Sequence, residues 1–238
     1  MQARLAQVQA LIEQEPSTHE GAQGLVGALQ RLCAAAARAI PAAGAGVSLM
    51  SEGGGRGVAA ASSEASERYE EMQFTVGEGP CIDAFAFRRP VLEPALDNRS
   101  TSRWPAYSQS AHAGGVRAVF AFPLQVGAAR LGVLDVYRTD SGSLTAEELA
   151  QALTFAQVAV LMLLDGQREA PLGRVAEGLD EALAYRSTLY QAQGMVMIQL
   201  GVPLGEALVR LRAFAFAHER RLSSVALDVV ARRLRLDR

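Results

Sequence analysis

The chain has 238 residues, half of them hydrophobic and a fifth charged, which is the composition of a globular protein with one or two domains and a substantial core. The N-terminal segment is polar and amphipathic rather than a secretory leader, and no uninterrupted apolar run reaches membrane-spanning length. We therefore expect a cytoplasmic protein that does not contact a membrane. The two cysteines, Cys33 and Cys81, form no CxxC pair and have no metal-ligand spacing, so we expect no metal.

Charge is distributed unevenly along the chain. Residues 1–171 contain 13 Arg and 18 acidic residues, a net charge of -5, whereas residues 172–238 contain 10 Arg and 7 acidic residues, a net charge of +3. Lysine is absent from the sequence, so contacts to phosphates or bases would be made by planar guanidinium groups. A basic C-terminal part favours a nucleic-acid contact there, because phosphate attraction dominates such affinity.

The first elements are two helices and two short strands. Apolar residues at helical spacing predict a helix that ends near Pro16 and a second helix over 21–40, with Cys33 on its apolar stripe. Segments 45–50 and 57–62 are typical of strands, and the glycine-rich stretch between them is typical of a hairpin turn.

Two stronger strands follow after a middle segment that we interpret as irregular, apart from a short helix over 102–112. Branched and aromatic residues over 116–124 and 130–138 predict a hairpin near the centre of a sheet. Thr145 and Glu148 then form a capping-box pattern that opens a long helix. This order predicts an α+β fold, with an antiparallel sheet and helices segregated from it.

Four motifs in this part resemble the GAF domain over about residues 20–168. They are FTVGEGPCIDAF (74–85), RRPVLEP (88–94), the Pro123–Leu124 pair before the turn, and LGVLDVY (131–137). The resemblance implies a sensor domain with a pocket for a small ligand over one sheet face, and terminal helices that dimerise. The identity of the ligand stays open.

Candidate pocket residues lie in the middle segment. We expect five side chains to line the ligand pocket, with loop packing as the alternative for the last four: Cys81, Asp83, Asp97, Arg103 and Trp104. His112 is interpreted as a solvated side chain rather than a haem ligand.

A catalytic role for Cys81 is an alternative interpretation. Its place after GEGP suits a helix N-terminus, which can lower the pKa of a thiol. Some GAF-fold enzymes are thiol-based methionine sulfoxide reductases, but Cys33 lies in an expected core helix and not beside Cys81. No HExxH motif or Ser/His/Asp grouping stands out, so we expect that the protein is not an enzyme.

Pro171 and nearby glycines mark a boundary between residues 1–168 and a second part, 169–238. A short heptad-like seam over 172–189 predicts a helical linker, and with it we favour a homodimer. Three short amphipathic helices follow, which predicts a small all-α bundle. We expect the first to end at Gly201, the second to have Pro203 in its first turn, and the third to be capped by Ser223 or Ser224.

This second part resembles the ANTAR domain over its last 50 to 60 residues. The resemblance is carried by QAQGMVM (191–197), EALVRLRAFA (206–215) and LSSVALDVVA (222–231). Gln193 stands where the family usually has Lys, which removes one charge. The resemblance implies a transcription antiterminator that binds hairpins in nascent RNA, with RNA polymerase as an indirect partner.

RNA contacts are predicted for seven residues of the bundle. Five would contact RNA directly, namely Arg186, Tyr190, Gln193, Arg212 and His218, while Ala192 and Gly194 would allow close approach. The alternatives are a surface salt bridge for Arg212 and core packing for Tyr190. We expect ligand control to pass through helices 145–168 and 172–189.

Two other functions remain open at this point. Helices 204–218 and 222–236 would form a helix-turn-helix in a DNA-binding regulator, although the second presents few base-reading side chains. A thiol redox enzyme would act through Cys81.

Overall fold

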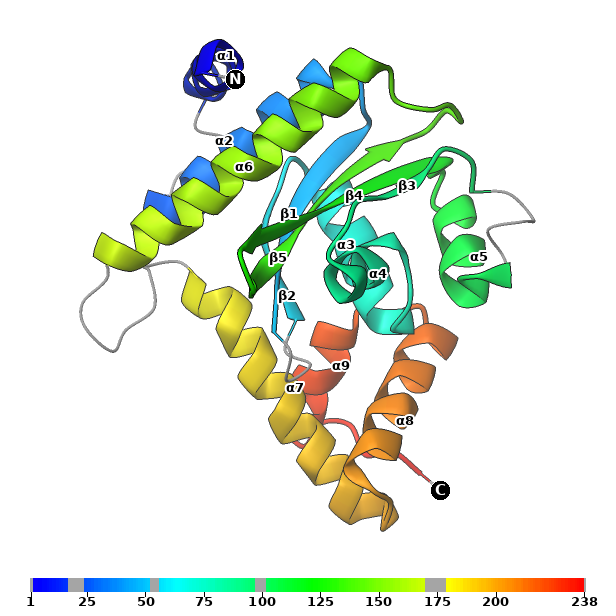
Figure 1. The fold of residues 1–238 in the computed structure, drawn as a ribbon. Coiled ribbons are helices and arrows are strands. Elements are labelled where there is room, and N and C mark those ends of the chain that lie inside the picture. Colours follow the sequence, from blue (N-terminus) through cyan, green and yellow to red (C-terminus); the bar gives the residue numbers. More distant parts are fainter. Residues whose placement is uncertain (1, 17–23, 52–55, 97–101, 170–178, 238) are drawn as a thin grey trace.

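The computed structural model describes residues 2–16, 24–51, 56–96, 102–169 and 179–237 (Figure 1). Its centre is a five-stranded antiparallel sheet in the order β2-β1-β5-β4-β3, which confirms the predicted α+β class and the central hairpin. The strands are β1 (Gly44–Met50), β2 (Arg56–Ala61), β3 (Val91–Glu93), β4 (Ala118–Val126) and β5 (Ala129–Arg138).

One face of the sheet is covered by α2 (Gly24–Ala39) and α6 (Ala146–Glu169), with α1 (Gln2–Glu13) packed on both helices (Figure 1). Alternate strand residues such as Phe122, Leu134 and Val136 point into this layer and are fully buried there with Phe155 of α6. The capping box at the start of α6 is confirmed, since Thr145 and Glu148 exchange side chain to backbone hydrogen bonds of 2.7 and 3.2 Å.

One described helix, α6 over Ala146–Arg168, is long and on average apolar enough to span a membrane, although polar residues interrupt its apolar run. The bent pair α7 and α8 passes the same test only when the two helices are taken together. In the fold, α6 buries Phe155, Ala159 and Leu163 against the sheet, so its apolar character serves the core.

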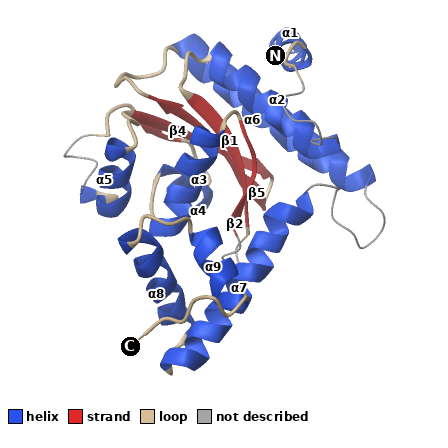
Figure 2. Ribbon diagram, turned by 180° about the vertical axis from the view of Figure 1, so that it is seen from behind, coloured by secondary structure: helices blue, strands red, loops and turns tan. Residues whose placement is uncertain are grey.

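Three helices cover the opposite face: α3 (Glu64–Val76), α4 (Pro80–Phe87) and α5 (Pro105–Ala113) (Figure 2). The expectation of an irregular middle segment is wrong, because α3 is a helix of thirteen residues. Ser63 caps its start by accepting the Ser66 N–H at 3.1 Å, and Gly77 ends it in the left-handed region at φ +81°.

The C-terminal bundle consists of α7 (Leu179–Leu200), α8 (Leu204–Ala217) and α9 (Leu222–Val230) around a separate apolar core. The predicted end of the first helix is confirmed, since Gly201 follows α7 at φ +66°. The predicted cap of the third helix is wrong: α9 already starts at Leu222, and Ser223 lies inside its first turn. The Ser223 hydroxyl instead donates a 3.0 Å hydrogen bond to Glu71 of α3. Residues 172–178 of the predicted heptad seam lie outside the described residues, as do the side chains of residues 179–186.

The bundle lies against the sheet domain rather than apart from it. In both ribbon views α7 runs beside the edge strand β2, while α8 and α9 lie next to α3 (Figures 1 and 2). The two parts of the chain therefore share an interface on the α3 face.

Candidate functional sites

The glycine-rich motif at the end of α3 positions two further helices. Gly77 ends α3, and Glu78 accepts hydrogen bonds from the backbone N–H groups of Ala106 and Tyr107 at 2.7 and 3.1 Å, which caps α5. Gly79, at φ +142°, then turns the chain into α4. A Cβ at Gly79 would lie 2.5 Å from Oε1 of Gln73, so the turn requires glycine. The motif thus places Cys81 in the first turn of α4, facing the sheet.

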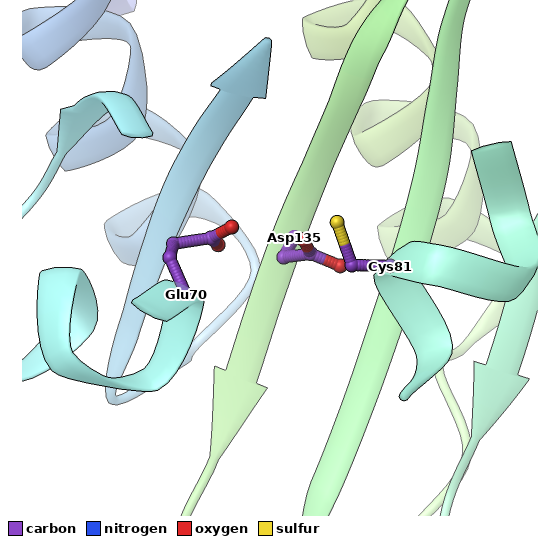
Figure 3. A group of neighbouring side chains, drawn as sticks. All are labelled: Glu70, Cys81 and Asp135. Carbon is purple, nitrogen blue, oxygen red and sulfur yellow. The ribbon is translucent and has the colours of Figure 1, made fainter. Parts of the chain in front are cut away.

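A buried polar cluster forms where α3, α4 and β5 meet. Glu70, Cys81 and Asp135 come from these three elements, and their side chains point toward one another (Figure 3). One sulfur and two carboxylate oxygens lie within 4.8 Å of each other, and all three residues are fully buried. Among the described residues, no other group of three His, Cys, Asp or Glu side chains brings its ligand atoms this close together.

Neighbouring polar groups hold two members of this cluster in place. Glu70 accepts hydrogen bonds from the hydroxyls of Ser48 at 2.5 Å and Tyr137 at 2.8 Å. Gln73 donates to the Tyr137 hydroxyl at 3.0 Å and accepts from the Cys81 backbone N–H at 2.8 Å. The carboxylate and the thiol are therefore oriented by one connected network.

A glycine in the sheet leaves space for this network. Gly46 of β1 lies opposite Asp135 in the register, and a Cβ there would sit 2.5 Å from Oε1 of Glu70. Glycine at this position lets the Glu70 carboxylate lie directly over the strand.

The electrostatics of the cluster differ from the sequence expectation for Cys81. Burial, followed by the negative charges of Asp135 and Glu70, raises the pKa of the Cys81 thiol, whereas a helix N-terminus alone would lower it. Burial also raises the pKa of Glu70 and of Asp135, the latter further through the charge of Glu70. These three acids therefore hold protons more tightly than they would in water, which disfavours a thiolate nucleophile at neutral pH.

Three of the predicted pocket residues come together in a second group. Asp83 accepts hydrogen bonds from Arg103 at 2.9 Å and from the indole N–H of Trp104 at 3.1 Å, and the guanidinium lies 4.6 Å from the indole ring centroid. Trp104 is buried, so the group ties α4 to the start of α5. A role in ligand binding stays a prediction for all three. Asp97 lies outside the described residues, and His112 is exposed.

The predicted RNA-binding residues of α7 separate into exposed and buried side chains. Tyr190 is 39% exposed, whereas Ala192 and Gln193 are buried. The Gln193 amide donates to the Leu204 carbonyl at 2.7 Å, which joins α7 to α8. No atom lies within 4 Å of a Cβ built on Gly194. Their RNA contacts stay predictions, as does that of Arg186, whose side chain lies outside the described residues.

On α8, His218 is exposed and stacks on Phe214, with ring centroids 3.9 Å apart. Arg212 points to the sheet domain, where its guanidinium would lie 2.5 Å from a Cβ at Gly77. A cation at this place faces the C-terminus of α3, where the helix dipole is negative.

The interface between the domains was not predicted from the sequence. Arg221 lies across the outer side of α3 and pairs with three carboxylates, Glu71 at 3.0 Å, Glu67 at 3.4 Å and Glu64 at 4.0 Å. The sequence contains one signal for this interface: the glutamates at positions 64, 67 and 71 are spaced so that they lie on one side of a helix. A groove of about 550 Å³ borders this contact, lined from α3, α5 and the end of α8.

Comparisons with known proteins agree with this architecture. A family model for the GAF domain matches residues 22–164, and one for the ANTAR domain matches residues 177–230. No curated protein matches the chain.

Solved structures show the fold of the first part. The GAF domain of an Acinetobacter phosphoenolpyruvate-protein phosphotransferase has a TM-score of 0.52 at 12% identity, covering 72% of this chain and 96% of that one. The equivalent domain from Coxiella burnetii has a TM-score of 0.51 at 16% identity, covering 71% and 95%. A free methionine-R-sulfoxide reductase from Neisseria meningitidis gives 0.51 at 15% identity, covering 71% and 91%.

The GAF model alone matches more than half of the chain, and the sheet with its two helical layers has the GAF fold. The three-helix bundle coincides with the second match. This protein therefore belongs to the GAF domain family and carries an ANTAR domain after its GAF domain, the architecture of a GAF–ANTAR regulator.

Proposed function

We propose that the protein is a cytoplasmic transcription antiterminator in which the GAF domain receives a signal and the ANTAR bundle binds hairpins in nascent RNA. ANTAR domains are known as RNA-binding domains, and the bundle here is the basic part of the chain. Tyr190 and His218 offer exposed rings on which unpaired loop bases can stack.

The observation that carries the proposal of signal control is the contact between α3 and the ANTAR bundle. Arg221 is bound to the carboxylates of α3, and Arg212 is turned toward Gly77. Both are cations of the RNA-binding part, so this arrangement withholds them from phosphates. We therefore infer that the described conformation is an inhibited one, and that a signal in the GAF domain releases the bundle.

The contact between Arg221 and α3 is weak enough to be released by a signal. Arg221 remains 35% exposed, and ion pairs of this kind contribute about 0.2–1 kcal/mol each. Burial raises the pKa of Glu71 even with Arg221 beside it, so the loss of hydration of this carboxylate is not fully offset. A ligand with a modest preference for the released state would shift such an equilibrium.

Dimerisation through α6 is part of the proposal. Leu153, Leu161 and Leu164 are 46%, 41% and 37% exposed and recur at helical spacing on the side of α6 that faces away from the sheet. An apolar stripe of this kind suits the same helix of a second copy.

Binding to a two-hairpin RNA and to duplex DNA of matched length, each titrated with salt, tests the RNA claim. The released bundle is obtained with Glu67→Gln/Glu71→Gln, which removes α3 carboxylates and leaves the ANTAR domain unchanged. We expect preference for the RNA, lost on adding Arg212→Ala but retained with Arg210→Ala, a neighbour on α8 that pairs with Glu206. Equal, steeply salt-dependent binding to both nucleic acids would show only general attraction to phosphate, and preference for DNA would favour a DNA-binding regulator.

A further inference from the structure

Asp135 is an acidic residue buried in the core of the GAF domain. It is fully buried in the central strand β5, and neither of its carboxylate oxygens receives a hydrogen bond of ordinary geometry from a described residue. A buried carboxylate that receives no such hydrogen bond is costly, and native cores contain few of them. The groups that act on this one are Glu70 and Cys81. One of its oxygens lies within 4.8 Å of both the Cys81 sulfur and a Glu70 oxygen, and Figure 3 shows the three side chains together.

We propose that Glu70, Cys81 and Asp135 bind one divalent metal ion of borderline softness, Zn²⁺ or Fe²⁺, inside the GAF domain. Each contributes one ligand atom, and these atoms lie within 4.8 Å of one another. The centre of a triangle with sides of that length is about 2.8 Å from each corner. Shifts of about 0.5 Å for the sulfur and about 0.7 Å for the oxygens reach the metal–ligand distances of such ions.

The ligand types select the class of ion. One thiolate excludes the hard cations Mg²⁺ and Ca²⁺ as preferred occupants, and two carboxylates disfavour Cu⁺. Three ligands from the protein leave a coordination position for water or a small molecule, as in zinc sites that are not purely structural. This open position would give the GAF domain a site at which a small ligand is sensed.

The orientation of the ligands supports the same conclusion. Ser48 and Tyr137 fix the Glu70 carboxylate, and Gln73 connects Tyr137 to the Cys81 backbone, the outer-shell support usual in metal sites.

The spacing of these ligands explains why the sequence indicates no metal. Glu70, Cys81 and Asp135 belong to three elements and are brought together by the register of β5 and the turn before α4. No short motif contains them.

Metal uptake by the full chain tests the proposal directly. The protein is incubated anaerobically with Zn²⁺, Fe²⁺ or Co²⁺, desalted and analysed by mass spectrometry for metal content. We expect about one ion per chain for the preferred metal and, with Co²⁺, a thiolate-to-metal absorption band. Cys33→Ser alters the other buried thiol, on the opposite face of the sheet, and should retain the band.

Two conservative variants separate binding from folding. Cys81→Ser should abolish the band, and Asp135→Asn, which keeps the shape of the side chain, should lower uptake at least tenfold. Asp135→Asn should also leave the metal-free chain at least as resistant to urea, because it removes a fully buried carboxyl group whose ionised form burial disfavours. Absence of uptake and band in the unaltered chain would overturn the proposal, as would uptake that both variants retain.

The consequence for regulation rests on the proposed function. Glu70 and Glu71 are consecutive in α3, and Glu71 holds Ser223 of α9. Metal or its ligand at Glu70 would thus move the helix that holds the ANTAR bundle. We expect metal to change RNA affinity severalfold in the unaltered chain and not in Glu67→Gln/Glu71→Gln. Metal uptake without this change would contradict the coupling alone, whereas absence of RNA binding in every sample would contradict the proposed function.

Discussion

Glu70 and Glu71 are neighbours in the chain, yet they belong to different parts of the molecule. Glu70 accepts hydrogen bonds from Ser48 and Tyr137 in the GAF core, and Glu71 accepts one from Ser223 of the ANTAR bundle. A helix separates consecutive side chains by about 100°. Two adjacent carboxylates can therefore connect a buried site with a domain interface without any long chain of contacts.

Gly194 raises a second question at the scale of single residues. Glycine inside a helix costs about 1 kcal/mol relative to alanine, and no atom lies within 4 Å of its missing Cβ. The described fold therefore does not require glycine there, and our explanation for it is the predicted close approach of RNA.

Gly194→Ala should accordingly stabilise the chain by about 1 kcal/mol in urea unfolding while weakening RNA binding in the Glu67→Gln/Glu71→Gln background. Gly205→Ala is the matched control, because its Cβ would also meet open space in a helix of the bundle. The control should leave RNA affinity unchanged. Unaltered RNA affinity of Gly194→Ala would remove this glycine from the RNA-binding surface.

At the scale of elements, the capping box at the start of α6 should contribute measurably to the free energy of unfolding. The backbone N–H of Thr145 donates to Glu148, and Arg138 of β5 also pairs with this carboxylate at 2.6 Å. Together these bonds hold the pKa of Glu148 below its ordinary value of 4.5. A carboxylate with a lowered pKa stabilises the fold above its unfolded pKa, and this contribution is lost as pH falls through the folded pKa.

Glu148→Gln should therefore lower the free energy of unfolding by about 1 kcal/mol at pH 7, and the difference from the unaltered chain should shrink as pH falls below 4.5. Urea unfolding at several pH values measures it. Glu147→Gln, in the same turn but in an exposed pair with Arg4, should have a smaller effect. A difference independent of pH would mean that the loss is one of packing.

The elements also show what the sequence can and cannot predict. Strong local signals, such as the hairpin of β4 and β5, the Thr145–Glu148 box and Gly201, lead to correct predictions. Helix α3 was missed because its many charged residues hide the apolar stripe. Its inward side is partly polar, with Ser66, Glu70 and Gln73 buried. A buried polar face of this kind is satisfied only by partners that the fold supplies.

The candidate sites follow the same pattern. Cys81 was singled out from its motif, but its partners Glu70 and Asp135 were not, although an acid within the apolar strand of β5 is a signal that could have been used. Arg212 was singled out for RNA, whereas its position at Gly77 depends on how the two domains pack. Contacts between distant segments are not encoded in local spacing.

At the scale of the whole molecule, the uneven distribution of charge along the sequence corresponds to a contact between a basic and an acidic surface. The basic ANTAR bundle lies on the acidic side of α3, so the attraction that would serve RNA also holds the bundle on its own GAF domain. In the proposed function, RNA and α3 compete for the same cations. The apparent affinity for RNA would then be the affinity of the released bundle multiplied by the fraction of molecules in which the bundle is released.

The affinity of a two-hairpin RNA for the full chain, compared with Glu67→Gln/Glu71→Gln, tests this competition most directly. Glu147→Gln/Asp140→Asn is the control, since it removes the same charge from exposed positions of the GAF part. We predict that Glu67→Gln/Glu71→Gln binds RNA about tenfold more tightly than both the unaltered chain and the control, as expected for losing one to two kcal/mol of competing contact. Equal affinity of this variant and the control would contradict inhibition of the ANTAR bundle by α3.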